Sequence, residues 1–271
     1  MKNIIYIIVF SVIFSLSSCK KEVEITKTET TSDTHLVIDG KIWSSIFQQK
    51  AAEYKALSYQ AYNIAKLRLD EALKEKSTKP LAVVTDIDET VLDNSPNSVH
   101  QALLGKGYES ASWKEWTAMA QADTLAGSRN FFTYAASKNV TVFYVSNRNT
   151  SEIDATLKNL KLFHFPFADS THVLLKTDTS NKEPRRQEIL KNYNVVLYLG
   201  DNLGDFSHVF DKKSTEDRNS STATIANAFG KKFIVLPNFN YGGWENALLN
   251  NSYDWTPKQK DSIIKSKLKS Y

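Results

Sequence analysis

Residues 81–90 read LAVVTDIDET and join an apolar run to a group of acidic residues. The run from Leu81 to Thr85 has the composition of a strand that is buried on both faces of a sheet. Residues two apart in a strand, or in the turn that leaves it, point the same way, so Asp86 and Asp88 can face one pocket. Two carboxylates so close repel each other unless a cation or a shared proton offsets the repulsion. The stretch therefore predicts a buried strand that ends at a metal site, an acid–base pair, or both.

Similar apolar runs recur along the chain, and stretches of helical character separate them. The runs lie at residues 140–145, 195–199 and 233–236, with a weaker one at 173–175, and the helical stretches at 128–137, 151–160 and 183–192. Strands that alternate with helices favour a parallel sheet with helices on both faces. The sequence therefore predicts an α/β fold with a doubly wound parallel sheet, in which ligands bind at the carboxyl ends of the strands.

Two flanking regions and one insertion complete the predicted fold. Apolar residues recur at helical spacing between about residues 42 and 76, which predicts an N-terminal helical segment. Residues 94–125 do not read as a strand–helix unit and carry Tyr108, Trp113 and Trp116. They are a candidate for a small, mainly helical lid over the strand ends. The Lys-rich residues 257–271 predict a terminal helix.

The N-terminus has the architecture of an export signal. Lys2 supplies a positive charge, and the apolar residues 4–16 are too few to span a membrane permanently. The sequence LSSC at residues 16–19 resembles the bacterial lipobox, in which the cysteine is lipidated after cleavage. The alternative is an ordinary secretory signal with a chance cysteine near its end. Because Cys19 is the only cysteine of the chain, no internal disulfide can form.

These features divide the chain into three parts. We expect a lipoprotein signal peptide at residues 1–18 and a flexible tether at 19–38, which begins with Lys, Glu, Thr and Ser and few large apolar residues. We expect a folded domain at residues 39–271. A lipid on Cys19 would attach this domain to a membrane.

The composition is that of an ordinary globular protein. Of the 271 residues, 41% are apolar and 24% are charged, which allows a sizeable core. The net charge of +4 and the pI near 8.8 come from many scattered Lys rather than from a basic block. A nucleic acid polymer is therefore not an expected partner, whereas a small anionic substrate fits. The sequence does not tell whether the chain forms a homodimer.

Polar residues follow the other predicted strands as well. Ser146 and Asn147 follow the second strand, where a hydroxyl and an amide could donate to a phosphoryl oxygen. Asp201 and Asp205 follow the fourth strand in a glycine-containing turn. Four carboxylates at one edge of a sheet would be costly without a hard cation, and Mg²⁺ prefers oxygen ligands. We therefore expect a site for Mg²⁺ or another divalent cation.

A lysine at the same edge could complete a phosphoryl-binding site. Lys182 opens the helical stretch after the weak strand, where its charge could neutralise a phosphoryl group during transfer. The alternative is a solvated surface lysine, as most of the others are expected to be.

In their order along the chain, these residues resemble the four-motif signature of the haloacid dehalogenase superfamily. The motifs are DIDET at residues 86–90, Ser146, Lys182, and GDNLGD at residues 200–205. Within that superfamily, VVTDIDETVLDNSP and VLYLGDNLGDF are similar to the class C acid phosphatases, the lipoprotein e(P4)-like 5'-nucleotidase family. The resemblance covers about residues 42–250 and includes NKEPRR, FGKKFIVLPN and YGGWE. It implies metal-dependent hydrolysis of phosphomonoesters on a Rossmann-like core.

The resemblance also implies a role for each motif residue. Asp86 would be the nucleophile and form an aspartyl-phosphate, and Asp88 would protonate the leaving oxygen and then activate water. Asp86, the backbone carbonyl of Asp88, and Asp201 would hold the cation, with Asp205 completing or supporting its coordination. Residues at the second and third motifs would bind the phosphoryl group, namely Ser146, Asn147 and Lys182.

The family's substrate pocket is lined with aromatic residues that stack on the leaving group. The positions that could do so here are Trp113, Trp116, Tyr241 and Trp244, although packing is an equally good reading of each. Family members often have a Tyr shortly after the first motif, where this chain has Asn97. The resemblance suggests 5'-nucleotides, including nicotinamide mononucleotide, as substrates, and the residue at position 97 puts that preference in question.

Two other functions remain open at the level of sequence. The aspartyl-phosphate could pass to an alcohol rather than to water, which would make the chain a phosphotransferase. Alternatively, the chain could be a non-catalytic binding lipoprotein that keeps the fold, although a degenerate member would be expected to have lost Asp86 or Asp88. Because class C acid phosphatases are typically lipoproteins, we expect a lipid-anchored protein of the bacterial cell envelope, at the outer membrane.

Overall fold

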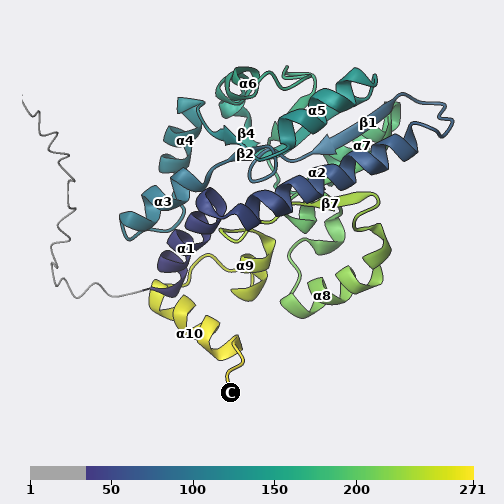
Figure 1. The fold of residues 1–271 in the computed structure, drawn as a ribbon. Helices are drawn as coiled ribbons and strands as arrows, with labels where there is room; N and C mark the ends of the chain where they lie inside the picture. Colours follow the sequence, from purple (N-terminus) through teal and green to yellow (C-terminus); the bar gives the residue numbers. More distant parts are fainter. Residues whose placement is uncertain (1–34) are drawn as a thin grey trace, which may run out of the picture. The chain divides into compact units, whose positions relative to one another are not determined.

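The computed structural model describes residues 35–271, which form one compact unit around a five-stranded sheet (Figure 1). The predicted signal peptide, Cys19 and most of the predicted tether lie outside the described residues. Every strand pairing in the sheet is parallel, and the strands lie in the order β5-β4-β1-β6-β7. In chain order they are β1 (Leu81–Thr85), β4 (Thr141–Asn149), β5 (Val173–Lys176), β6 (Asn194–Gly200) and β7 (Phe233–Val235). The predicted α/β parallel sheet is confirmed.

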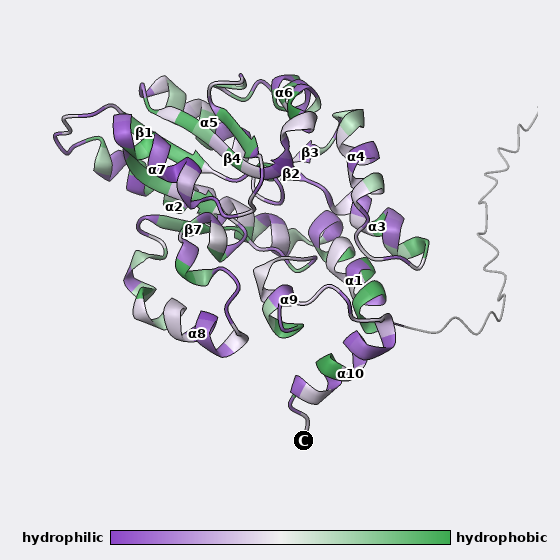
Figure 2. Cartoon of the chain, turned by 180° about the vertical axis from the view of Figure 1, so that it is seen from behind, coloured by the Kyte–Doolittle hydropathy of each residue, from purple (hydrophilic) through white to green (hydrophobic). Residues whose placement is uncertain are grey.

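Helices cover both faces of this sheet, because successive strand residues point to opposite sides. On one face, Val83 of β1 belongs to a core with α2 (Ala52–Ala72), α5 (Ser128–Ser137) and α6 (Ile153–Leu162). On the other face, Val84 belongs to a core with α7 (Glu183–Asn192). Figure 2 shows strand β1 coloured as apolar, as expected of a strand between two helical layers.

The predicted N-terminal helical segment is two helices, α1 (Leu36–Lys50) and α2. Ala51 separates them because its backbone is extended, with ψ near 130°. The two helices pack differently. Helix α2 supplies Ala61, Ala65 and Leu69 to the core, whereas α1 contacts α3. Among residues 35–271, no helix combines the length and apolar character needed to cross a membrane.

The segment predicted as a lid contains two helices held between two short strands. Strands β2 (Leu92–Asp93) and β3 (Asp123–Thr124) pair antiparallel, and α3 (Ser95–Leu103) and α4 (Ser110–Met119) lie between them in the chain. We keep the name lid for residues 94–125. The strand pairing brings the two ends of the lid together beside the end of β1.

The C-terminal third adds elements that the sequence analysis did not anticipate. Two short helices, α8 (Thr215–Thr224) and α9 (Gly243–Leu248), follow β6 and β7. The terminal helix α10 (Pro257–Lys267) begins where predicted and ends before the last residues of the chain. Leu36 at the start of α1 donates its backbone N–H to Asp261 Oδ1 of α10 at 3.0 Å, so the first and last described helices are joined.

Candidate active site

Four elements bring the predicted site residues to the carboxyl edge of the sheet. Asp86 directly follows β1, Ser146 lies in the last part of β4, and Asp201 directly follows β6. Lys182 immediately precedes α7. The β1–β6 pairing continues into the site, because the backbone N–H of Asp86 donates to the carbonyl of Leu199 at 3.0 Å. The parallel sheet therefore gathers side chains that are far apart in the sequence.

Three carboxylates form a compact group beside one buried lysine. Oxygens of Asp86, Asp201 and Asp205 lie within 4.8 Å of one another. The ammonium of Lys182 lies 2.6 Å from Asp86 Oδ1 and 2.6 Å from Asp205 Oδ1. Only 5% of the lysine side chain is exposed, so it is not a solvated surface lysine. Its single positive charge cannot balance three carboxylates.

Burial, together with the unbalanced charge, raises the pKa of two carboxyl groups. Burial raises the pKa of Asp86 well above its usual value, and the neighbouring carboxylates add to the shift although Lys182 opposes it. Burial and the charge of Asp205 raise the pKa of Asp201 to about 7. Three oxygen donors that hold excess negative charge are what a hard divalent cation requires. The residues present therefore fit a divalent cation.

The turn that carries Asp201 and Asp205 requires glycine at its start. A Cβ at Gly200 would lie 2.4 Å from Asp205 Oδ2, so only glycine allows the carboxylate to approach this closely. The backbone N–H of Asn202 donates to Asp205 Oδ2 at 2.9 Å. Arg186 of α7, which is buried, donates to the carbonyls of Gly204 and Asp205 at 2.8 Å each. Helix α7 therefore positions Lys182, which immediately precedes it, and also the acidic turn at residues 200–205, which Arg186 contacts.

Asp201 is held by residues from two other parts of the chain. Thr90 Oγ1 donates to Asp201 Oδ1 at 3.2 Å, and Asn238 Nδ2 donates to Asp201 Oδ2 at 2.8 Å. The side-chain oxygen of Asn238 in turn accepts the backbone N–H of Asn240 at 2.8 Å. Asp201 is therefore oriented from the turn after β1 and from the loop that follows β7.

Helix α1 anchors that loop. Asn240 is buried, accepts a hydrogen bond from Ser45 Oγ at 3.1 Å and donates to Gln48 Oε1 at 2.9 Å. Lys41 Nζ bonds to the carbonyl of Asn240 and lies 2.8 Å from Glu245 Oε2. The N-terminal helix thereby reaches the acidic group through two asparagines.

Asp88 lies outside the three-carboxylate group, and its side chain is paired with the guanidinium of Arg148. Arg148 Nη2 and Nε donate to Asp88 Oδ1 at 2.7 and 3.0 Å, and Nε also lies 3.2 Å from Oδ2. Ser146 Oγ donates to Asp88 Oδ2 at 3.3 Å, and Asn94 Nδ2 donates to Oδ1 at 2.8 Å. The sequence predicted four carboxylates at one edge, and the structure divides them into a group of three and one arginine pair. The side chain of Asp88 is thus turned toward Arg148.

The amide of Asn147, predicted to bind phosphate, is used by the neighbouring loop. Its Nδ2 donates to the carbonyl of Ser180 at 2.9 Å, and its Oδ1 accepts from Arg185 Nη2 at 2.7 Å. Arg185 also donates to the carbonyl of Ser146 at 2.6 Å. Asn147 is exposed, whereas Ser146 is fully buried. In this structure the amide of Asn147 holds the loop before α7.

The four candidate aromatic residues differ in their surroundings. Trp113 lies with its ring centre 5.8 Å from the guanidinium carbon of Arg148. Trp116 donates its indole N–H to Asn94 Oδ1 at 2.8 Å. Tyr241 donates its hydroxyl to the fully buried carboxylate of Glu89. Trp244 is about half exposed and has no ring partner among the described aromatic contacts.

Asn97 lies inside the lid. It is buried in α3 and accepts a hydrogen bond from Ser112 Oγ of α4 at 3.3 Å. The side chain at this position therefore links the two lid helices.

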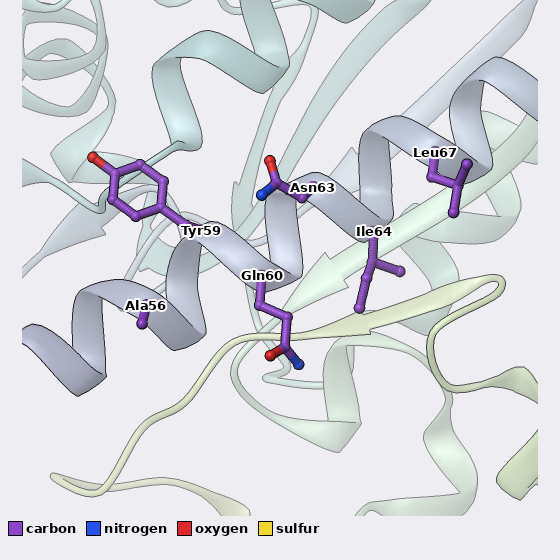
Figure 3. Close-up of a pocket in the computed structure, with 6 residues that line it drawn as sticks. All are labelled: Ala56, Tyr59, Gln60, Asn63, Ile64 and Leu67. Atoms are coloured by element: carbon purple, nitrogen blue, oxygen red, sulfur yellow. The ribbon is translucent and has the colours of Figure 1, made fainter.

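A separate hollow lies along α2, away from these residues (Figure 3). Its volume is about 550 Å³ and its lining is mainly apolar. It contains no acidic or basic side chain, so it offers none of the groups that phosphoryl chemistry needs. Its lining residues are Ala56, Tyr59, Gln60, Asn63, Ile64 and Leu67.

Carboxylates, a buried lysine and a buried hydroxyl at the carboxyl edge of a parallel sheet define a site for the hydrolysis of phosphate esters. The chain belongs to the haloacid dehalogenase superfamily, subfamily IIIB, the acid phosphatases, whose family model matches residues 14–244. The predicted family and the predicted enzyme class, a phosphoric monoester hydrolase, are confirmed. Phosphatases of this superfamily need a divalent cation, which agrees with the acidic group described above.

Solved structures give the same result. The class C acid phosphatase from Bacillus anthracis is 42% identical, with a TM-score of 0.84, and the match covers 87% of this chain and 99% of that one. A structure of the class C acid phosphatase from the same organism with tungstate bound is also 42% identical, with a TM-score of 0.84 and coverage of 86% and 98%. The predicted resemblance to class C acid phosphatases is therefore confirmed.

The sequence did not reveal the role of several residues of the site. Arg148 was visible directly after Ser146 and Asn147, and the need of Asp88 for a counter-charge could have identified it. Asn94, Asn238 and Arg186 could not be found this way, because neutral donors and a second arginine in a basic stretch carry no distinctive pattern.

The raised pKa of Asp201 gives a testable dependence of stability on pH. Since the folded pKa is about 7 and the usual value is 3.8, the folded state binds more protons than the unfolded state between these values. This contribution therefore lowers the free energy of unfolding as pH rises from about 4 to 7. With EDTA present, we expect Asp201→Asn to have a higher Tm than the wild type at pH 8, with the difference shrinking toward pH 5.

Addition of Mg²⁺ should reverse the order at pH 8, because the cation stabilises the wild type more than the variant. Thermal unfolding at both pH values, with and without Mg²⁺, checks this. A Tm difference that is independent of pH and of cation would contradict the account of Asp201.

Proposed function

We propose that this acid phosphatase hydrolyses phosphomonoesters through an aspartyl-phosphate on Asp86 and depends on Mg²⁺. The observation that carries the proposal is the contact of one buried ammonium, Lys182 Nζ, with both Asp86 and Asp205 at 2.6 Å. A lysine in this place favours the ionised form of Asp86, which is the form that attacks, and adds positive charge where a phosphoryl group would arrive. The tungstate-bound relative supports an oxyanion site in this fold, since tungstate is a tetrahedral oxyanion.

The proposed reaction has two steps. A carboxylate oxygen of Asp86 forms a bond to phosphorus as the ester oxygen leaves, and the protonated carboxyl of Asp88 gives its proton to that oxygen. Water then attacks phosphorus, Asp88 takes the proton of the water, and the Asp86 carboxylate is released together with inorganic phosphate. Ser146, which is buried beside Asp88, would donate to a phosphoryl oxygen. A bound Mg²⁺, held by Asp86, Asp201 and Asp205, would offset the charge on the phosphoryl oxygens.

Replacement of the nucleophile should abolish turnover. We expect Asp86→Asn to lower kcat for p-nitrophenyl phosphate by at least about 10³-fold, because an amide cannot replace the carboxylate in forming the acyl phosphate. Asp254→Asn, at an exposed position, should behave as the wild type. Phosphate release is measured with Mg²⁺ and with EDTA, and acid-quenched protein is examined by mass spectrometry for a phosphoryl adduct. Substantial metal-independent activity in Asp86→Asn would refute the proposal.

We also propose that 5'-nucleotides, including nicotinamide mononucleotide, are substrates. Support comes from the class C relationship and from the aromatic side chain of Trp113, which lies beside Arg148. The hydrogen bond of Asn97 within the lid means that position 97 offers no aromatic ring to a base. Stacking would therefore depend on fewer rings than in relatives with a Tyr at this position.

Nucleotide preference is measured as a ratio between matched esters. We expect kcat/KM for nucleoside 5'-monophosphates to exceed that for ribose 5-phosphate, because only the nucleotides carry a base that can stack. Trp113→Ala should reduce the ratio by about 10-fold, at about 1–1.5 kcal/mol for a lost aromatic contact. Equal values for the two esters in the wild type would show that the base is not recognised.

Lipidation of Cys19 is proposed from the sequence. We infer that the mature protein is attached to the outer membrane of the bacterial envelope by a lipid on this residue. Expression of the full chain in a bacterium with a clickable fatty acid should label the wild type and leave Cys19→Ser unlabelled and in the soluble envelope fraction. Equal labelling of both proteins, or a membrane-bound Cys19→Ser protein, would argue for a different means of attachment.

A further inference from the structure

The lid reaches Asp88 through two hydrogen bonds. Trp116 Nε1 of α4 donates to Asn94 Oδ1 at 2.8 Å, and Asn94 Nδ2 donates to Asp88 Oδ1 at 2.8 Å. We propose that Trp116 and Asn94 are positioning residues for Asp88, the residue that protonates the leaving group in the proposed reaction. This inference rests on the proposed role of Asp88 as the general acid.

The orientation of the Asn94 amide follows from the chemistry of tryptophan. An indole N–H can only donate, so the atom of Asn94 that faces Trp116 must be the oxygen. The amide nitrogen must then face Asp88, where it donates to the carboxyl group. If Trp116 lost its N–H, Asn94 Oδ1 would lose its strongest donor, and the amide would be held less firmly against Asp88.

The rest of Asn94 is fixed independently. Its side chain is nearly fully buried, and its backbone N–H donates to Glu89 Oε1 at 2.8 Å. Arg148 Nη2 lies 3.5 Å from Asn94 Oδ1 and gives only weak support to the amide orientation. Trp116 is therefore the stronger of the two donors to Asn94 Oδ1, while Asp88 and the carbonyl of Leu92 accept from Nδ2 on the other side of the amide.

The hydrogen bonds also distinguish the two oxygens of Asp88. Oδ1 accepts three bonds of 2.7 to 3.0 Å, two from Arg148 and one from Asn94. Oδ2 has only two longer contacts, with Arg148 Nε at 3.2 Å and Ser146 Oγ at 3.3 Å. Oδ1 is therefore the more firmly held oxygen of Asp88, and Asn94 supplies one of its three short bonds.

Trp116 itself is placed by packing. Its ring packs against the main core, and its neighbour Thr117 donates to Glu152 Oε1 at 2.8 Å, which ties α4 to the region after β4. With its N–H bonded to Asn94, the indole has its polar atom directed into the protein. These contacts favour a positioning role over the stacking role that the sequence suggested for this residue.

A leaving-group comparison tests the inference. p-Nitrophenolate leaves with little protonation, whereas the alkoxide of ribose 5-phosphate needs a proton, so a defect in the acid affects the alkyl ester far more. We expect Trp116→Phe, which keeps the ring and removes the N–H, to lower kcat for ribose 5-phosphate about 10-fold with little change in KM. The value for p-nitrophenyl phosphate should change less than about 2-fold. Trp43→Phe, at a position that is 74% exposed, is the control expected to match the wild type.

A second variant separates positioning from a general loss of structure. Asn94→Ala should show the same dependence on leaving group, and the double variant should be no worse than Asn94→Ala alone, because both residues act through one hydrogen-bond chain. An equal loss on both esters, or a raised KM with unchanged kcat, would overturn the inference in favour of a structural or stacking role. Additive losses would do so as well. Asp86→Asn in the same assay tests the proposed reaction separately, since retained activity there would contradict the aspartyl-phosphate whatever Trp116→Phe does.

Discussion

The mutual repulsion of buried carboxylates is the constraint on which this site depends. Carboxylate oxygens of Asp86, Asp201 and Asp205 lie within 4.8 Å of one another, and the ammonium of Lys182 is the opposing charge that contacts two of these carboxylates. The fourth carboxylate, Asp88, is separated from them by its pairing with Arg148. The sheet edge thus holds one group with excess negative charge, suited to a cation, beside a carboxyl group that is paired with an arginine. Asp86 and Asp88, which both follow β1, can therefore take different chemical roles.

Much of this arrangement could be predicted from sequence because parallel strands place their carboxyl ends together. An unbroken apolar run before Asp86 and another before Asp201 were enough to bring those two residues to one edge. The helical stretches at 128–137 and 183–192 match α5 and α7, where Gly127 precedes the first helix and Pro184 lies in the first turn of the second. Helix α8 was not predicted, since it is mostly polar and supplies one buried residue, Arg218, to the interior.

The hydrogen-bond donors around the carboxylates could not be predicted from the sequence. Asn94, Asn238 and Arg186 act through hydrogen bonds to residues that lie in other parts of the chain, and an asparagine in a loop is common without any such role. The link from α1 is a further case, because Ser45 and Gln48 read as ordinary polar positions of a helix. Their importance follows only from the loop of Asn238 and Asn240, which lies almost two hundred residues further along the chain.

The two-residue pairing of β2 and β3 has a consequence for how this fold diversifies. An insertion whose ends meet can change in length or content without disturbing the register of the main sheet, which is a common route by which one scaffold acquires new substrates. Here Trp116 of the lid is bonded to Asn94 at the lid's own base. A lid transplanted from a relative would bring its own residues at positions 94 and 116 together. A change of substrate and a change of turnover rate would therefore occur together, through the same exchange of the lid.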